Sequence, residues 1–459
     1  MKGTPLGFTK KRRRRTASAV AAGGLLLLGA TGHQASASQL VVTNLSADGT
    51  GSFAAAAREA NLDDDSDQIV FAEGLRGTIP ITETLRFIRP VEITGPGAGV
   101  NGDDLDGPVL KGPADGASLL FDSGAELGSK EESRLSGLDL ERLRVDVRSS
   151  PLVIQDSHVT GDGVGGNGVY VYGYLTPARV AIRDSTVTGF GLGVNVQSSS
   201  ATIDGSVISD NWRSGGVYAG GYAGVTIADS LITGNVAQPD VSRKYAPVPA
   251  SGAGVQAGYE SSIDLVNSTI MGNVAVGEGS YGGGVAGASS GDMTIIGSTV
   301  LANSAEIGGG IASDSGGKTG YNKFAISDSV VTGNESTEDG AGGDCGGSHL
   351  RSNGGNILGS PGACALDPTD VAGVGSPLAP LTDSRGNSPV EALHRVWATI
   401  DRELNPIHPL TDEELEDAFE VQDSTEDGAG ENCGGSDGPP GSCGFVPSDL
   451  PGAALPPFR

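Results

Sequence analysis

The stretch that decides the fold is residues 224–235, GVTIADSLITGN, because its pattern returns seven times between residues 152 and 334. Each copy has a serine, an aliphatic residue three positions before it, and Ile or Val two positions after it. The serines are Ser157, Ser185, Ser206, Ser230, Ser268, Ser298 and Ser329. Asp, Asn or Gly precedes each serine, and these residue types tolerate left-handed or tight-turn backbone. Each copy therefore predicts a strand, a sharp corner and a second short strand.

A further strand is predicted between the copies, where glycine precedes a β-branched residue in Gly168-Val169, Gly193-Val194, Gly216-Val217, Gly254-Val255, Gly284-Val285 and Gly310-Ile311. The serines are 21 to 38 residues apart, which is too irregular a spacing for a propeller. One such unit cannot bury its apolar side alone, so neighbouring units must stack. The sequence thus predicts an all-β fold, a right-handed parallel β-helix with coils roughly 4.8 Å apart.

Three columns of side chains should run along such a helix. The aliphatic residues before the serines, among them Ile154, Ile182, Ile227, Ile295 and Ile326, should stack in one buried column. The serines should form a ladder of inward or corner hydrogen bonds. The last five copies also have Asn five residues after the serine, and these amides should bond from coil to coil. They are Asn211, Asn235, Asn273, Asn303 and Asn334.

Residues 1–37 are predicted to be an export signal. They have a basic run at 10–15, an apolar run at 17–30 and Ala35-Ser36-Ala37 as a cleavage site. Its removal leaves 22 basic against 56 acidic residues, a formal charge of −34. Such a chain is expected to be secreted, not to bind nucleic acid, and not to span a membrane, since no later apolar run is long enough. We expect a monomer.

The mature chain divides into a β-helix over 38–401 and a Cys/Gly/Pro-rich tail over 402–459 that opens with a short helix. The repeat core is 152–334, and 336–401 is its C-terminal part. Phe53–Ala60 should form a short helix that covers the N-terminal end of the core. Acidic clusters at 63–67 and 103–106 admit calcium, but they lack the glycine and distal glutamate of an EF-hand. They are interpreted as solvated loops, and no cofactor is predicted.

The four cysteines are Cys345, Cys364, Cys433 and Cys443. In an exported chain an even number of cysteines predicts disulfides. Residues 336–348 (STEDGAGGDCGGS) and 424–436 (STEDGAGENCGGS) are near duplicates, and each is followed by a second cysteine. Of the three possible connectivities, the local pairs Cys345–Cys364 and Cys433–Cys443 are therefore favoured.

The N-terminal run from VVTNLSADGTGSF to VEITGPGAGV resembles the start of secreted right-handed β-helix proteins of the pectin-lyase-like superfamily. The repeats IADSLITGN and GGGVAG, with NGGNILGSPGAC and PLAPLTDSRGNSPVEALHRVWATID near 353–401, are similar to exported proteins with a choice-of-anchor Q domain and to polymorphic outer-membrane protein repeats. The resemblance covers about 38–401. The sequence departs from the family's pattern at His394-Arg395-Val396-Trp397. It implies an extracellular β-helix and leaves the activity open.

Catalytic signals are weak. The corner aspartates Asp156, Asp184, Asp229 and Asp328 could be paired carboxylates for glycosidic cleavage, but their fixed place before the serine favours a turn role. The lyases that the resemblance implies need a basic residue as base, and the repeats have few Lys or Arg. The hydrolase branch implies a Gly-His-Gly, whereas His158 stands between Ser157 and Val159. No catalytic residue is predicted.

Aromatic residues give the better local signal. Strand alternation in VYVYGY turns Val169 and Val171 inward, so Tyr170, Tyr172 and Tyr174 should face outward. The following coils add Asn195 and Gln197, then Trp212 and Tyr218, near a loop at 236–251. Aromatic rings beside amides are typical of a surface on which sugars stack. Tyrosine is also common in strands because of its strand propensity alone, so a purely structural role stays open.

We therefore interpret the chain as a secreted binding or scaffold protein for a polysaccharide or another cell-surface component. The alternatives are a polysaccharide lyase or glycoside hydrolase and a structural or adhesive stalk. A cleft of clustered Arg or Lys and carboxylates would favour the enzyme, and a featureless surface would favour the stalk.

Overall fold

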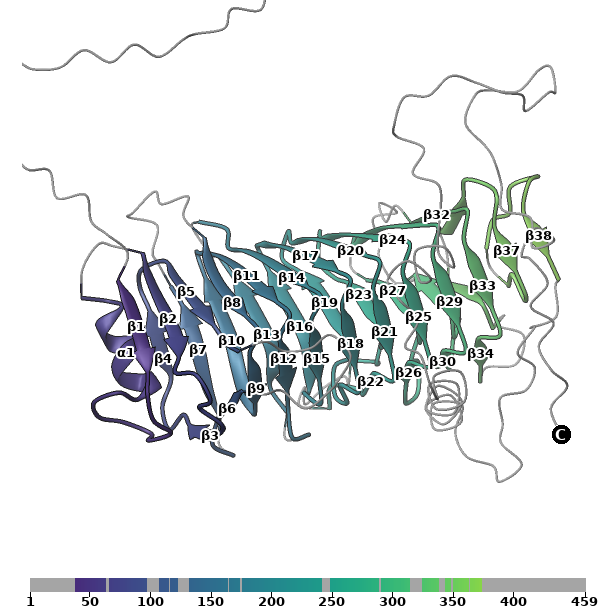
Figure 1. Ribbon diagram of the computed structural model, residues 1–459. Coiled ribbons are helices and arrows are strands. Elements are labelled where there is room, and N and C mark those ends of the chain that lie inside the picture. Colours follow the sequence, from purple (N-terminus) through teal and green to yellow (C-terminus); the bar gives the residue numbers. More distant parts are fainter. Residues whose placement is uncertain are drawn as a thin grey trace, which may run out of the picture. The chain divides into compact units, whose positions relative to one another are not determined.

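The computed structural model describes residues 38–373 except 63–65, 97–106, 115, 123–131, 164, 174–175, 242–247, 289, 314–323, 338–342, 348–349 and 363. The predicted export signal, the second cysteine pair and the tail lie outside these residues. The described chain forms four parallel sheets, and each coil passes from sheet A to sheet B and then to sheet C. Figure 1 shows the coils stacked along one axis. The predicted right-handed parallel β-helix is confirmed.

The strands of each sheet follow one another coil by coil. Sheet A contains β1 (Gln39–Val42), β2 (Asp67–Phe71), β5 (Val91–Thr94), β8 (Ser133–Ser136), β11 (Pro151–Gln155), β14 (Arg179–Arg183), β17 (Ser200–Asp204), β20 (Gly224–Ala228), β24 (Ser262–Val266), β28 (Asp292–Ile296), β32 (Phe324–Ser327) and β36 (Leu350–Ser352). Sheet B contains β3 (Gly77–Pro80), β6 (Pro108–Lys111), β9 (Asp139–Glu141), β12 (His158–Thr160), β15 (Thr186–Thr188), β18 (Val207–Ser209), β21 (Leu231–Thr233), β25 (Thr269–Met271), β29 (Thr299–Leu301), β33 (Val330–Thr332), β37 (Ile357–Leu358) and β38 (Val371–Ala372).

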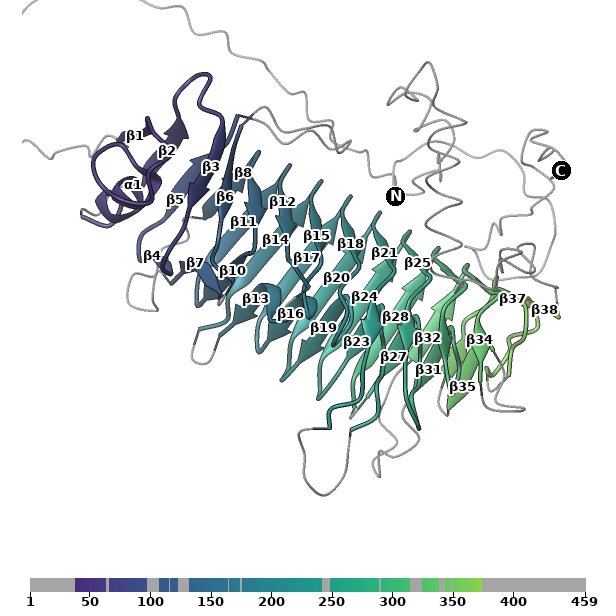
Figure 2. The ribbon, with the colours of Figure 1, turned by 90° about the horizontal axis from the view of Figure 1, so that it is seen from below.

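Sheet C lies on the side of the β-helix labelled in Figure 2 by β13, β16 and β19. It contains β4 (Leu85–Phe87), β7 (Ala117–Phe121), β10 (Leu143–Arg148), β13 (Asn167–Tyr172), β16 (Leu192–Gln197), β19 (Val217–Gly220), β23 (Val255–Ala257), β27 (Val285–Gly287), β31 (Ile311–Ser313) and β35 (Cys345–Gly347). The small sheet D, between sheets B and C in the later coils, contains β22 (Val236–Ala237), β26 (Val274–Ala275), β30 (Ser304–Ala305) and β34 (Glu335–Ser336).

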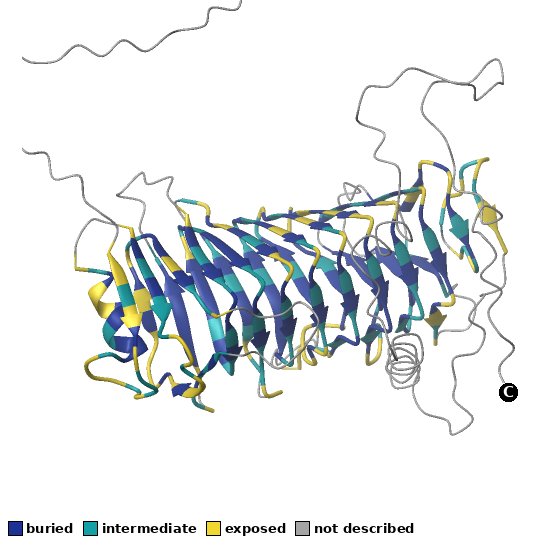
Figure 3. Ribbon diagram, in the orientation of Figure 1, coloured by how far each residue is buried: buried dark blue, intermediate teal, exposed yellow. Residues whose placement is uncertain are grey.

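The predicted aliphatic column forms the centre of sheet A. Strand register pairs Ile154 with Ile182, Ile203, Ile227, Leu265, Ile295 and Ile326 in turn. All seven side chains are at most 1 % exposed. Figure 3 shows buried residues along the strands of the stack. Burial of this continuous core is the main source of stability, because each coil shields the apolar face of the next.

The corners between sheets A and B have the backbone that the sequence predicts. The residue before each repeat serine has positive φ, from 45° at Asn267 to 57° at Gly297. Only glycine, and to a lesser degree Asn and Asp, adopts this conformation at low cost. The corner aspartates are therefore turn residues, which is the role that the sequence favoured.

Two ladders of buried side chains join successive coils. The backbone N–H of each repeat serine donates to the Oγ of the next serine, at 3.1–3.2 Å from Ser157 to Ser329. The Nδ2 of each ladder asparagine donates to the Oδ1 of the next at 2.9 Å, from Asn211 to Asn334. Both predicted ladders are confirmed. They satisfy polar groups that burial would otherwise penalise.

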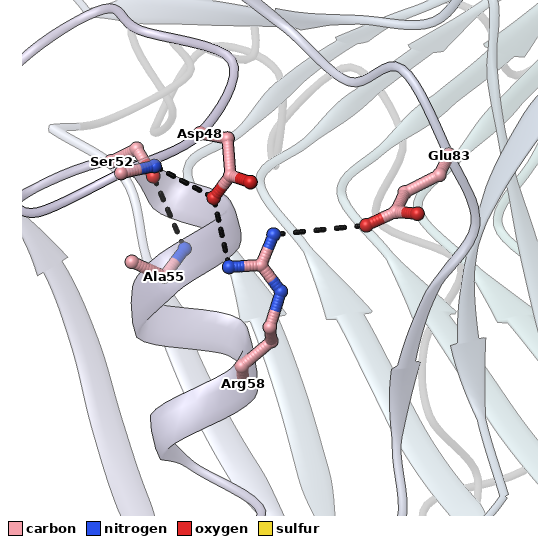
Figure 4. Close-up of polar contacts among 6 residues, drawn as sticks. Asp48, Ser52, Ala55, Arg58 and Glu83 are labelled. Carbon is pink, nitrogen blue, oxygen red and sulfur yellow. Dashed lines mark hydrogen bonds and ion pairs between the residues drawn. The ribbon is translucent and has the colours of Figure 1, made fainter.

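The N-terminal end is covered by the one α-helix among the described residues, α1 (Phe53–Glu59). Ser52 is its N-cap, and the Ser52 Oγ accepts from the Ala55 N–H at 3.2 Å. Phe53, Ala54 and Ala57 are buried against the first coils. Arg58 pairs with Asp48 at 2.8 Å and with Glu83 at 3.7 Å on the exposed side (Figure 4). The predicted helix over 53–60 is confirmed.

A disulfide joins Cys345 and Cys364 near the C-terminal end, with 5.5 Å between their Cα atoms. It is the first of the two pairs that the sequence favours. Cys345 follows Ile311 in the inward column of sheet C and is fully buried. The bond therefore ties the last strand of sheet C to the loop that closes the final coils.

Candidate functional site on the outer face of sheet C

Strand register brings the predicted site residues of sheet C together. Tyr170 on β13 lies beside Asn195 on β16, which lies beside Tyr218 on β19. Tyr172 lies beside Gln197 in the adjacent column. Their strand neighbours Val169, Val171, Val194 and Val196 are fully buried, so these polar side chains point outward. We call this surface the sheet C platform.

Tyr218 lies flat on the platform, because two glycines leave room beneath its ring. A Cβ on Gly220 would stand 2.7 Å from the Tyr218 hydroxyl, and a Cβ on Gly258 of the next coil would stand equally close. The ring therefore lies close to the backbone of both glycines, and the side chain as a whole stays half-buried. Burial raises the pKa of the Tyr218 hydroxyl, which is hydrogen-bonded to Gln197. Tyr218 is half-buried and is not part of the apolar core.

A row of amides continues from Tyr218 across the platform. Gln197 Nε2 donates to Asn195 Oδ1 at 3.0 Å, and Asn195 Nδ2 donates to Asn167 Oδ1 at 3.4 Å. The amides hold one another in place and keep further lone pairs and N–H groups available at the surface. An aromatic ring beside amides that are held in place gives a ligand both an apolar face to stack on and hydrogen-bond partners for its hydroxyl groups.

The preceding coil adds charge to the same face, through β10. Asp146 on β10 is the register neighbour of Tyr170, and Arg148 is the neighbour of Tyr172. Asp146 is buried and lies 3.9 Å from the Arg144 guanidinium, whereas Arg148 is exposed. The pKa of Tyr170 is raised by its own burial and then by Tyr172, with Arg148 acting in the opposite direction. The Tyr170 and Tyr172 rings stack at 6.2 Å.

The side of the platform where the strands begin is bounded by two corner segments. Trp212 follows β18 and lies next to Gly163, and its carbonyl accepts from Gln238 Nε2 at 3.0 Å. The structure therefore places Trp212 beside the platform and not on it. The loop after β22 starts as a hairpin, in which Asp240 and Val248 bond to each other in both directions. Its return limb reaches the platform, where Gln256 Nε2 donates to Ser251 Oγ at 2.8 Å.

Two exposed tyrosines bound the opposite side, and sequence reasoning missed both. The rings of Tyr222 and Tyr259 meet edge to face at 5.7 Å, at the corner where sheet C strands end. A hydrogen bond with Tyr259 and the nearby Glu260 raise the Tyr222 pKa to about 12. Neither residue follows the strand alternation, and the two stand at different distances before β20 and β24, so no regular spacing in the sequence indicated them. Tyr174 lies outside the described residues.

Other polar clusters give no comparable surface. His158 is the register neighbour of Asp139 on sheet B. Burial raises the Asp139 pKa, and the charge of His158 lowers it. A groove of about 340 Å3 on sheet A is lined by Glu132, Arg179 and Ser200 among others. Within the described ranges, no three His, Cys, Asp or Glu side chains are placed to hold a metal ion. The predicted acidic clusters fall largely outside these ranges.

One comparison with known protein families agrees with the observed fold. A family model described as a right-handed beta helix region matches residues 167–359. Pectate lyase Pel9A is 13 % identical, with 65 % of this chain and 76 % of that chain covered and a TM-score of 0.42. The periplasmic alginate epimerase AlgG is 12 % identical over 67 % of this chain and 76 % of that chain, with a TM-score of 0.29. No curated protein matches the chain.

The choice-of-anchor assignment stays a prediction. Across the residues that the structure describes, no helix is both long enough and apolar enough to cross a membrane.

Proposed function

We propose that the protein is an extracellular glycan-binding protein that holds a polysaccharide on the sheet C platform. The observation that carries this proposal is Tyr218, whose ring lies over Gly220 and Gly258 beside the hydrogen-bonded Gln197 and Asn195. A sugar ring stacks its C–H face on an aromatic face, and amides at the rim bond its hydroxyl groups. The predicted export signal and the Cys345–Cys364 disulfide support an extracellular setting.

Variants of the platform test this proposal against a panel of immobilised polysaccharides. Replacing Tyr172 and Tyr218 together by Ala removes both rings, and we expect retention on the bound glycan to fall at least tenfold. Thr226→Ala is the matched control, because Thr226 is exposed on β20 of sheet A, the strand that follows β19 in the chain. A double variant that keeps the parent's melting temperature and binds every glycan as the parent does would contradict the proposal.

A polysaccharide lyase or glycoside hydrolase is the second candidate, since arginines and a carboxylate lie next to the rings. Arg144, Asp146 and Arg148 could serve as a base or neutralise charge on a substrate. The same panel separates the candidates when each polysaccharide is also assayed for new reducing or unsaturated ends. Product that disappears in Arg148→Ala but persists in Arg179→Ala, on sheet A, would favour the enzyme.

A further inference from the structure

Tyr222 and Tyr259 form a pair of exposed rings at the corner where strands of sheet C end and strands of sheet A begin. Tyr222 is 66 % exposed and Tyr259 is 53 % exposed. Their rings meet edge to face, with 5.7 Å between the ring centroids. The Tyr222 N–H donates to the Tyr259 carbonyl at 3.3 Å, so the two residues lie side by side on successive coils. Neither ring belongs to the apolar core, so core packing does not account for the pair.

The backbone at Tyr222 shows that this ring is placed at a cost. Tyr222 has φ 67°, in the left-handed region that a residue with a bulky side chain rarely adopts. Ser149, Ser198 and Ser290 have the same place in other coils, two residues before a sheet A strand, and they also have positive φ. Strained backbone of this kind is concentrated at functional sites. A tyrosine where other coils have serine therefore indicates a role beyond the turn.

This arrangement favours oxidative coupling of the two phenols. A phenol that has lost one electron and its hydroxyl proton carries unpaired electron density on the carbons ortho to its oxygen. Because the two hydroxyl groups are hydrogen-bonded to each other, the ortho carbons of the two rings also lie near one another. Both side chains are exposed, so rotations on the picosecond-to-nanosecond scale can bring these carbons into contact. We propose that Tyr222 and Tyr259 are a modification site, at which peroxidase-type oxidation joins the two rings as dityrosine.

The step balances with hydrogen peroxide as the oxidant. Each tyrosine loses one electron and one proton, and the two radicals form one carbon–carbon bond between their ortho carbons. Transfer of a proton from each of these carbons to its phenolic oxygen then restores both aromatic rings. The two hydrogen atoms that are removed convert one peroxide molecule into two molecules of water. The product keeps both hydroxyl groups and joins the coil of β19 covalently to the coil of β23.

Such a bond links positions that are 37 residues apart (259 minus 222). A covalent link restricts the unfolded chain and thereby stabilises the folded one, as a disulfide does. Unlike the Cys345–Cys364 disulfide, a carbon–carbon bond is not broken by thiols. The predicted export places the chain in an oxidising setting, where this modification can form.

Treatment of the dilute full-length protein with a peroxidase and hydrogen peroxide tests the proposal. We expect dityrosine fluorescence to appear while the protein stays a monomer on a reducing denaturing gel. The chain has nine tyrosines, so digestion and mass spectrometry must locate the bond. The main linked product should contain Tyr222 and Tyr259, at a mass two hydrogen atoms below the sum of the two peptides. The melting temperature should rise by several degrees on treatment.

Phenylalanine variants serve as controls, because they keep a ring and lose the phenol. Tyr222→Phe and Tyr259→Phe should each abolish the linked peptide and the gain in melting temperature. Tyr281→Phe is the matched control, because Tyr281 precedes β27 on the next coil, at the opposite end of the sheet C strands. It should leave both results unchanged. A parent protein that forms no dityrosine, a bond that maps chiefly to other tyrosines, or a covalent dimer as the main product would overturn the proposal.

Discussion

At the scale of single residues, the stack is held in register by side chains that bond along its axis. Asn273 Oδ1 accepts from both the N–H and the Nδ2 of Asn235, at 3.0 and 2.9 Å. Its own Nδ2 donates to Asn303 Oδ1 at 2.9 Å. Each hydrogen bond between two ladder asparagines is donated towards the C-terminal end, so the residue that follows Asn334 in the ladder must be an acceptor. Asp344 fills that place, accepting from Asn334 Nδ2 at 2.8 Å.

Removing a middle rung should be costly. Asn273→Ala leaves the backbone N–H of Asn235 and one of the two N–H groups of its side-chain amide without an acceptor, and each costs about 1–3 kcal/mol. We expect the free energy of unfolding in urea to fall by at least about 2 kcal/mol. Asn195→Ala, which removes a surface amide, should change it by less than about 0.5 kcal/mol. Equal effects of the two substitutions would show that the ladder adds nothing beyond a surface hydrogen bond.

The end of the ladder should give a pH signature. Burial raises the pKa of Asp344 above its ordinary value, although the N–H groups of Ser360 and Asn334 oppose this. The folded protein therefore holds this proton more tightly than the unfolded chain. The contribution of Asp344 to the free energy of unfolding is fully present below the pKa that this carboxyl has in the unfolded chain. It is lost as the pH rises through the higher pKa of the folded protein. Measured between pH 3 and 7, the unfolding free energy of the parent minus that of Asp344→Asn should fall with pH. A rising difference would contradict this assignment.

Sequence reasoning found the ladder because Asn recurs at a fixed distance from the serine, but it could not find Asp344. This residue belongs to the duplicated cysteine segment, ten positions after Asn334, and only the fold brings the two together. Sequence reasoning missed Tyr222 and Tyr259 for a similar reason. They are at corners of unequal length, so no constant spacing aligns them. Residues that repeat with the coil were predictable, and those that close an end or a corner were not.

At the scale of the element, the corner between sheets A and B is set by one backbone conformation. Asp156 has φ 48°, and Gly205 and Gly297 occupy the same place in other coils. Asp156→Gly should therefore be tolerated within about 1 kcal/mol, since backbone strain is relieved while unfolded-state entropy rises. Asp156→Val should destabilise by about 1–2 kcal/mol or more, because its Cβ is branched. Thermal melts of both variants check this, and a valine variant as stable as the glycine variant would refute it.

At the scale of the whole molecule, the periodic core could be predicted from the sequence. The sheet C platform on its outer face could be predicted only in part. Alternation placed Tyr170, Tyr172, Asn195 and Gln197 on one outer face, and strand register confirms that placement. Alternation could not show that the Tyr218 ring packs against Gly258 of the next coil. Nor could it place Trp212, because the corner before sheet C differs in length between coils. A binding role for these residues stays a prediction that the platform variants test.

The charge of the whole chain gives the last prediction. The formal net charge is −27, and like charges meet where the coils stack. The pKa of Asp184, for example, is raised by burial and then by the neighbouring Asp156 and Asp204. Such self-repulsion destabilises the compact state and is screened by salt, whose Debye length falls from about 30 Å at 0.01 M to about 8 Å at 0.15 M. We expect the melting temperature at pH 7 to rise by several degrees between these NaCl concentrations. Near the isoelectric point of about 4.4 the same salt change should have little effect, because the net charge is then close to zero. A melting temperature at pH 7 that falls or stays level would mean that salt-sensitive ion pairs, such as Arg58 with Asp48, outweigh the repulsion.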